Sequence, residues 1–146
     1  MKTAETARIV DGFAGKTIRF DEQNMRYHSV KVPKRYNRFI VYFEPDGLAY
    51  VWLPGKRPVA VLPWSVKVTT WAPDGSASKT NFHGKLCFSG FLTRGRDFCR
   101  FEKQLEISIQ EIADGDVFGL RNLKVPCRLC RADVDFATAR KTLGSL

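Results

Sequence analysis

The chain has 146 residues, with 24 Lys and Arg against 15 Asp and Glu, so its net charge is +9. Hydrophobic residues make up 44% and charged residues 27%, which indicates a single folded domain over 1–146 and argues against a disordered chain. No apolar run approaches the roughly 20 residues of a membrane-spanning helix, and no apolar stretch typical of a secretory signal is visible at the start. The charge favours an anionic partner such as nucleic acid, an anionic polysaccharide, an acidic protein or a membrane surface, or is simply a solvated basic surface.

The N-terminal half predicts one helix followed by strands. Apolar residues at helical spacing predict a short helix over 6–13, ended by Gly12 or Gly15. Strands are expected where the apolar period changes to two, at 16–20, 27–32, Arg38–Phe43 and 48–53. A basic loop is expected at 31–37, and the Pro, Asp and Gly residues of 44–47 predict a tight turn.

The C-terminal half continues the β pattern. Strands at 59–62 and 65–70 are separated by Pro63, which cannot donate to a sheet and so predicts a bulge or an edge. Segments 85–91 and Phe98–Phe101 predict a hairpin. Clean alternation predicts a strand at 105–110, which a turn at 113–116 connects to a further arm at 117–120. A short C-terminal helix is expected from Asp133, with Phe136, Ala139 and Leu143 on one face.

Eight or more short strands, with turns about every 8–12 residues, are typical of a mainly β protein. We therefore expect a single small antiparallel β-barrel, lipocalin-like or sandwich-like, with short N- and C-terminal helices. The nearly sequential hairpins favour an up-and-down barrel.

Several of these motifs occur together in a familiar order. They are Gly15-Lys16-Thr17, Tyr42-Phe43 with Asp46-Gly47, Trp64-Ser65-Val66, Lys85-Leu86-Cys87-Phe88 and the later Cys99. Over residues 12–101 the chain therefore resembles a family of small proteobacterial β proteins of unknown function. The resemblance implies a bacterial, exported, barrel-like domain with no assigned catalytic residues. The absence of a visible signal and the second cysteine pair within 102–146 depart from that pattern.

The four cysteines allow three interpretations. Cys87 and Cys99 flank the predicted hairpin tip, so they are disulfide candidates in an oxidising compartment. Cys127 and Cys130 form a CxxC motif, and all four thiolates together are candidate zinc ligands, although Cys87 and Cys99 lack the spacing of about two to four residues that zinc knuckles use. Alternatively, all four are reduced thiols. A redox role for Cys127 and Cys130 is supported by nearby Arg residues, but not by the β surroundings.

Catalytic signatures are weak. His28 and His83 have no acidic or cysteine partner at ligand spacing, and no motif of a hydrolase, metalloprotease, P-loop or dinucleotide site is present. Four carboxylates have the potential to converge, but their spacing does not recommend a paired site; they are Glu44, Asp46, Glu102 and Glu106. We expect no enzyme and no cofactor, with zinc the one exception.

Basic residues cluster beside aromatic ones and form a candidate contact surface. Its members are Lys31, Lys34, Arg35 and Arg38, which interleave with Tyr36 and Phe39, and Arg94, Arg96 and Arg100 at the hairpin tip. The sequence thus predicts a non-enzymatic binding domain with an anionic or protein partner, periplasmic or secreted if a signal was removed and otherwise cytoplasmic. The alternative is a cytoplasmic nucleic-acid-binding β-barrel, in which cationic loops and exposed aromatics hold a single strand. A CxxC redox or zinc protein ranks third.

Overall fold

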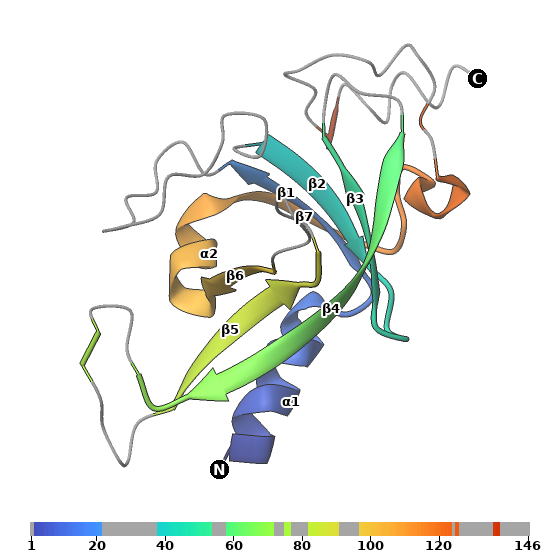
Figure 1. The fold of residues 1–146 in the computed structure, drawn as a ribbon. Helices are drawn as coiled ribbons and strands as arrows, with labels where there is room; N and C mark the ends of the chain where they lie inside the picture. The colour runs from blue at the N-terminus through green and yellow to red at the C-terminus, as the bar shows by residue number, and fades with distance from the viewer. Residues whose placement is uncertain are drawn as a thin grey trace.

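A computed structural model of the chain describes residues 2–21, 38–53, 58–71, 75–76, 82–90, 97–123, 125 and 136–137 (Figure 1). Helix α1 (Lys2–Phe13) is followed by six strands: β1 (Lys16–Asp21), β2 (Arg38–Phe43), β3 (Leu48–Trp52), β4 (Val59–Thr69), β5 (His83–Phe88) and β6 (Phe98–Phe101). Helix α2 (Glu102–Ser108), strand β7 (Ile109–Asp114) and a short 3-10 helix, η4 (Leu120–Asn122), complete the order.

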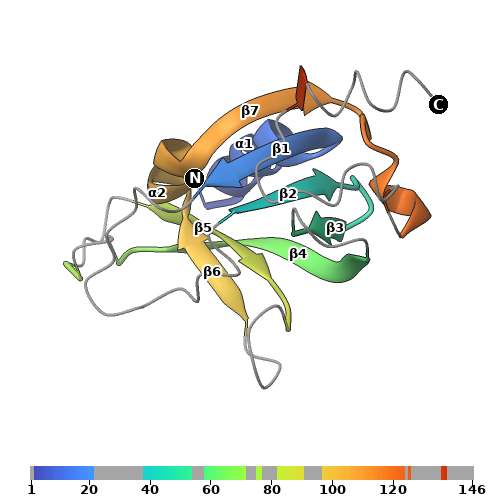
Figure 2. The same cartoon turned by 90° about the horizontal axis from the view of Figure 1, so that it is seen from above.

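The seven strands form one antiparallel sheet in the order β6-β5-β4-β3-β2-β1-β7. Strands β1 to β6 follow one another as a meander, as the hairpin spacing predicted, and β7 returns to pair with β1. The sheet curls strongly into a half-barrel, with β5 and β6 turned at a steep angle to β1 and β2 (Figure 2). Strands β6 and β7 stand at opposite ends of the strand order, and α2 joins them along the chain.

Strand β4 is one long strand that changes partner in the middle. Residues 59–63 pair with β3, whereas 64–69 pair with β5. Pro63 lies at the change: its carbonyl accepts from the Ser89 backbone N–H at 2.9 Å, and the next N–H, of Trp64, donates to Gly47 O at 2.9 Å. Proline has no backbone N–H to donate, and Pro63 lies where β4 stops pairing with β3 and starts pairing with β5. Strand β4 continues through this point, so no separate second strand begins there.

The expected strand at 105–110 is wrong over most of its length, because α2 occupies Glu102–Ser108 and β7 begins only at Ile109. Leu105 and Ser108, three residues apart, share the buried face of α2, while Ile107 is 63% exposed. Strong helix formers precede Leu105, and their preference for a helix outweighs the alternation of Leu and Ile that suggested a strand.

The expected arm at 117–120 is also not a strand. A turn at 117–118 leads through Gly119, at φ 64°, into η4. The Asp116 carboxylate caps this turn, since Oδ1 accepts from Leu120 N at 2.8 Å and Oδ2 from Arg121 N at 3.0 Å. Satisfying these otherwise unpaired N–H groups stabilises the helical turn in place of extended chain.

The concave face of the sheet, covered by α1 and α2, holds the larger core. Its buried rings pack closely: Phe20 and Phe39 stack with their centroids 4.9 Å apart, and Phe43 and Trp64 meet edge to face at 5.2 Å. This core consists of Ile9, Phe13, Ile18, Phe20, Phe39, Val41, Phe43, Ala49, Val51, Trp64, Leu86, Phe88, Phe98 and Leu105.

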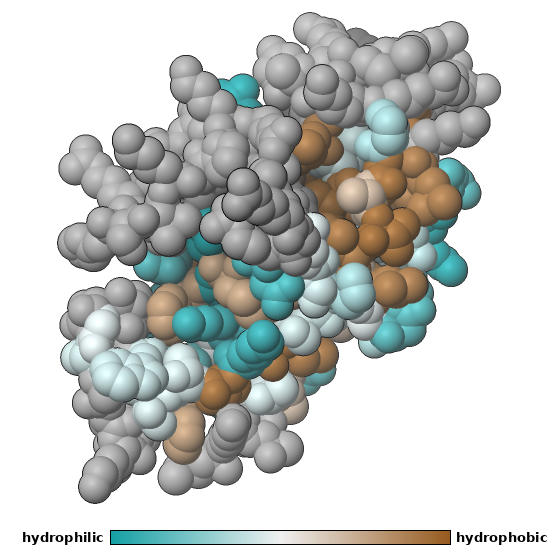
Figure 3. Space-filling model, in the orientation of Figure 1, coloured by the Kyte–Doolittle hydropathy of each residue, from teal (hydrophilic) through white to brown (hydrophobic). Residues whose placement is uncertain are grey.

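A second cluster covers the convex face. It consists of Ile40, Tyr42, Trp52, Val59, Phe118, Leu120, Val125 and Phe136. Strand β2 is therefore buried on both faces, which explains why Arg38–Phe43 is an almost continuous apolar run in the sequence. Figure 3 shows hydrophobic side chains gathered where β3 and β4 run, and Val61 and Leu123 are among the exposed apolar residues.

Three expected elements lie wholly or mostly outside the described residues. The predicted strand at 27–32 and basic loop at 31–37 are among them, and of the predicted C-terminal helix only Phe136 and Ala137 are described, both helical. Among the described helices, none is long and apolar enough to cross a membrane.

Candidate functional site

Cys87 on β5 and Cys99 on β6 lie directly opposite one another and form a disulfide, with their Cα atoms 4.2 Å apart. Because Ser89 N bonds to Pro63 O, the odd-numbered residues of β5 direct their backbone groups toward β4. The cysteines therefore occupy a non-hydrogen-bonded position of the β5–β6 ladder, where paired Cα atoms approach to about 4.5 Å. A site of four thiolates around zinc is incompatible with this bond. Cys127 and Cys130 lie outside the described residues.

The predicted basic surface is described at only two of its seven residues. Lys31, Lys34, Arg35, Arg94 and Arg96 lie outside the described ranges. Arg38 is half-exposed, and its Nε lies 3.3 Å from Asp21 Oδ2.

Arg100 does not lie on an exposed surface, so its predicted placement is wrong. It is 6% exposed, its guanidinium carbon lies 3.9 Å from the Phe98 ring centroid, and its Nη1 donates to Cys99 O at 2.9 Å. Side chains alternate across a strand, so Arg100 shares the concave face with Phe98, while Cys99 and Phe101 face outward.

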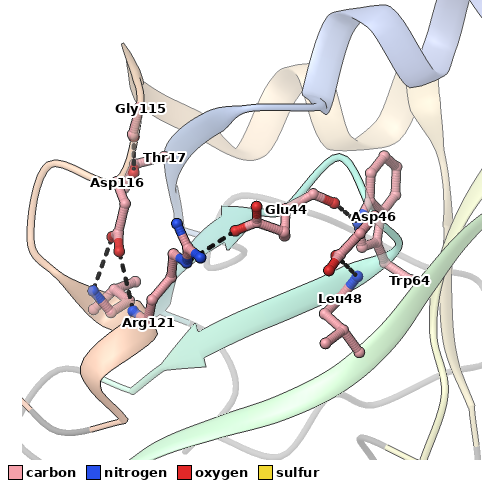
Figure 4. Close-up of polar contacts among 9 residues, drawn as sticks. Thr17, Glu44, Asp46, Leu48, Trp64, Gly115, Asp116 and Arg121 are labelled. Atoms are coloured by element: carbon pink, nitrogen blue, oxygen red, sulfur yellow. Dashed lines mark hydrogen bonds and ion pairs between the residues drawn. The ribbon is translucent and has the colours of Figure 1, made fainter.

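Hydrogen bonds join β1 to the end of β7, and the turn between β2 and β3 to β4 (Figure 4). The Thr17 hydroxyl donates to Gly115 O at 2.6 Å, the Trp64 indole N–H donates to Glu44 O at 3.0 Å, and Asp46 Oδ1 accepts from Leu48 N at 3.1 Å. Three of these residues, Thr17, Asp46 and Trp64, belong to motifs that the sequence analysis singled out. In this structure those motifs hold the scaffold together.

Glu44 forms an ion pair with Arg121 in this region. Its Oε2 lies 3.2 Å from Arg121 Nε, and the Glu44 side chain is largely buried whereas that of Arg121 is exposed (Figure 4). Burial raises the pKa of the nearby Tyr42 phenol, and the negative charge of Glu44 raises it further. The phenol is thus kept neutral beside a carboxylate that also binds Arg121.

The four carboxylates considered as a paired site divide between two regions. Glu44 and Asp46 lie at the β2–β3 turn, where they bind Arg121 and a backbone N–H, respectively. Glu102 and Glu106 lie on α2, and Glu102 binds Arg8 at 2.8 Å. Each contact described is one that stabilises the fold.

A small hollow lies where α1, β5 and α2 meet. It is lined by Glu5, Arg8, Phe82, His83, Gly84, Phe101, Glu102 and Lys103. Arg8 bridges the helices, with one terminal nitrogen 2.6 Å from Glu5 Oε1 and 2.8 Å from Glu102 Oε1. These hydrogen bonds raise the pKa of Arg8, and the bond from Arg8 lowers the pKa of Glu5. The charges at the rim therefore compensate one another.

Within the described ranges, no group of three His, Cys, Asp or Glu side chains is placed to hold a metal ion. His83 lines the hollow, whereas His28 lies outside the described residues.

Sequence reasoning missed the Arg121–Glu44 ion pair and the role of Asp116. An Asp directly before a short turn-forming run is a recognisable cap signal and could have identified Asp116. Nothing local connects Glu44 with Arg121. Comparisons with protein-family models, curated proteins and solved structures gave no match.

Proposed function

We propose that this chain is a non-enzymatic binding domain of an oxidising compartment, which contacts an anionic partner through the basic residues carried on its half-barrel. The enclosed core supports contact through the exterior, since the concave face is occupied by large buried rings, including Phe20, Phe39, Phe43, Phe88 and Phe98.

The surplus of positive charge is the observation that carries this proposal. The chain has 24 Lys and Arg against 15 Asp and Glu, and the predicted contact residues Lys31, Lys34, Arg35, Arg94 and Arg96 contribute to that surplus. A surplus of one sign attracts an oppositely charged partner and raises its rate of association.

The arginines of the scaffold, by contrast, are largely compensated. Arg19 Nε lies 2.8 Å from Glu111 Oε1, and Arg8, Arg38 and Arg121 each contact a carboxylate. Because these cations already have partners within the fold, the remaining basic residues supply the net attraction.

The compartment is proposed from the Cys87–Cys99 disulfide, because such bonds persist in the periplasm and outside the cell but are rare in the cytosol. The family resemblance, which implies an exported domain, supports the same location.

The compartment is tested by the intact mass of protein from its native host, with thiols alkylated before reduction. We expect Cys87 and Cys99 to be protected and the mass to be about two daltons low for their bridge. Alkylation of both thiols would contradict the oxidising compartment and favour the cytoplasmic alternative.

Binding is tested by titrating the full chain with an acidic polysaccharide and with single-stranded DNA across a range of salt concentrations. We expect the double variant Lys34→Ala, Arg35→Ala to bind the preferred polymer more weakly than the control Lys16→Ala, Lys103→Ala, which removes the same charge from the scaffold. A chain that binds neither polymer at low salt would refute the proposed function, and a preference for DNA would favour the nucleic-acid-binding alternative.

A further inference from the structure

The convex face of β4, β5 and β6 presents three rows of side chains opposite the core. One row contains Ser65, Cys87 and Cys99, the next Lys67, Lys85 and Phe101, and the third Thr69 and His83. The intervening residues of these strands, such as Trp64, Phe88 and Phe98, form part of the core on the other face. We call this three-row surface the lysine face.

Lys67 and Lys85 lie directly opposite one another on neighbouring strands. The described registers contain three other pairs of charged residues, and each unites opposite signs: Lys16 with Asp114, Arg19 with Glu111, and Asp21 with Arg38. Side chains that face each other in this way have Cβ atoms about 4.5–5.5 Å apart, and like charges at this separation destabilise the sheet. The Lys67–Lys85 pair is thus an exception to the charge pattern of the described strands.

The neighbours that the described registers give this pair carry no negative charge. None of the residues that the registers place on the lysine face is acidic. Lys67 is exposed, and Lys85 is half-buried with its Nζ 4.7 Å from the Phe101 ring centroid. Two residues beyond the end of β4, the Trp71 side chain is 57% exposed. Lys67 and Lys85 therefore share one surface with the Phe101 ring, and the exposed Trp71 follows the end of the strand that carries Lys67.

We infer that the lysine face binds an acidic glycan, whose carboxylate or phosphate groups lie between Lys67 and Lys85 and whose sugar rings pack against the exposed aromatic faces. This inference rests on the proposed function in that the partner is anionic. A bound anion relieves the repulsion between the lysines, which is the physical reason for its preference for this position.

A glycan fits better than a nucleic acid because the Cys87–Cys99 bond belongs to the lysine face itself. The face is therefore intact where disulfides persist, in the periplasm or outside the cell. Acidic polysaccharides are abundant polyanions there. Aromatic rings suit either polymer, since each presents an apolar face to a ring.

The experiment titrates the full chain with polygalacturonate, with its fully methyl-esterified form and with single-stranded oligo-dT, at several salt concentrations. We expect polygalacturonate to bind and the neutral ester not to bind. The double variant Lys67→Ala, Lys85→Ala is expected to weaken polygalacturonate binding about tenfold and to reduce the dependence of affinity on salt by about one counterion per lysine. The single variants Lys67→Ala and Lys16→Ala form a matched comparison, because each removes one positive charge from a strand.

Lys67→Glu provides a second test, which separates an effect at this position from a general effect of the net charge of the chain. It places opposite charges across the β4–β5 pair, so we expect its unfolding midpoint to rise while its affinity for polygalacturonate falls below that of Lys67→Ala. Unchanged affinity in both Lys67 variants, or an equal loss in Lys16→Ala, would overturn the lysine face while leaving an anionic partner in place. If the wild-type chain binds none of the charged polymers, the proposed function fails as well. Stronger binding of oligo-dT with the same dependence on Lys67 would replace the glycan by nucleic acid.

Discussion

The side chain of Ile9 in α1 lies directly over Gly84 in β5, so that a Cβ built on Gly84 would stand 2.0 Å from Ile9 Cδ1. Ile9 is fully buried in the larger core, so any shift of its Cδ1 atom must be absorbed by that core. Glycine at position 84 therefore allows α1 to approach the sheet closely, beside the hollow where Arg8 bridges the two helices.

We expect Gly84→Ala to lower the free energy of unfolding by about 1–3 kcal/mol, because the added methyl group overpacks the contact. Gly12→Ala is the matched control, since a Cβ there meets nothing within 4 Å and should be neutral or stabilising. In a double-mutant cycle measured by urea unfolding, Ile9→Val should recover part of the loss. Simple additivity of the two substitutions would show that they do not interact.

Thr17→Val should destabilise the fold by about 1–2 kcal/mol, because it removes two part-buried hydrogen bonds between the Thr17 hydroxyl and the backbone. The Thr17 hydroxyl donates to Gly115 O and accepts from Val117 N at 3.4 Å, and the residue is fully buried. Thr17→Ser keeps the hydroxyl and should retain most of the stability. Equal losses in both variants, measured by chemical denaturation, would assign the effect to the methyl group instead.

Tyr42 should titrate above the ordinary tyrosine pKa of 10.0, because burial and then the charge of Glu44 disfavour its phenolate. A folded-state pKa above the unfolded value means that stability declines as the pH rises from the unfolded pKa through the raised one. Absorbance titration should reveal a late phenolate transition that Tyr42→Phe removes. Glu44→Gln should shift that transition to lower pH, but not as far as the ordinary tyrosine pKa, since Tyr42 remains buried. A transition at unchanged pH would contradict the contribution assigned to Glu44.

The ion pair between Arg8 and Glu5 should contribute a small, pH-dependent increment to stability. The hydrogen bond from Arg8 lowers the pKa of Glu5 below 4.5, so the increment is present above the unfolded pKa and is lost as the pH falls through the lowered one. Both groups are substantially exposed, which limits the effect to about 1 kcal/mol or less. Unfolding of the wild type and Arg8→Ala should therefore differ near neutral pH and converge in acid or high salt. A difference independent of pH would argue for packing rather than charge.

Local patterns predicted much of the framework. Strand Arg38–Phe43 was predicted with the bounds that β2 has, and the helix expected to end at Gly12 or Gly15 ends at Phe13. Such segments are set by apolar periodicity and by residues that favour turns, both of which are properties of adjacent positions. The same method failed at 105–110, where alternation and helix propensity disagree and the burial of Leu105 and Ser108 decided for a helix.

The candidate sites were less accessible to this reasoning. The hairpin pattern brought Cys87 and Cys99 together, because hairpin strands pair locally. The hairpin pattern did not show which face of β6 carries Arg100. Arg100 points inward because it lies two residues from the buried Phe98, on the same face of the strand. The Arg121–Glu44 contact joins segments that no local pattern connects.

The sequence by itself determined the mainly β class, most of the strands, the cysteine hairpin and the surplus of positive charge. Only the tertiary structure decided which charges meet, that Ile9 packs on Gly84, and that Lys67 faces Lys85. The physical reason is that apolar periodicity specifies which residues share one face of a helix or strand, whereas the strand register and the curvature of the sheet specify which residues of different elements meet. Those two depend on the packing of the whole core.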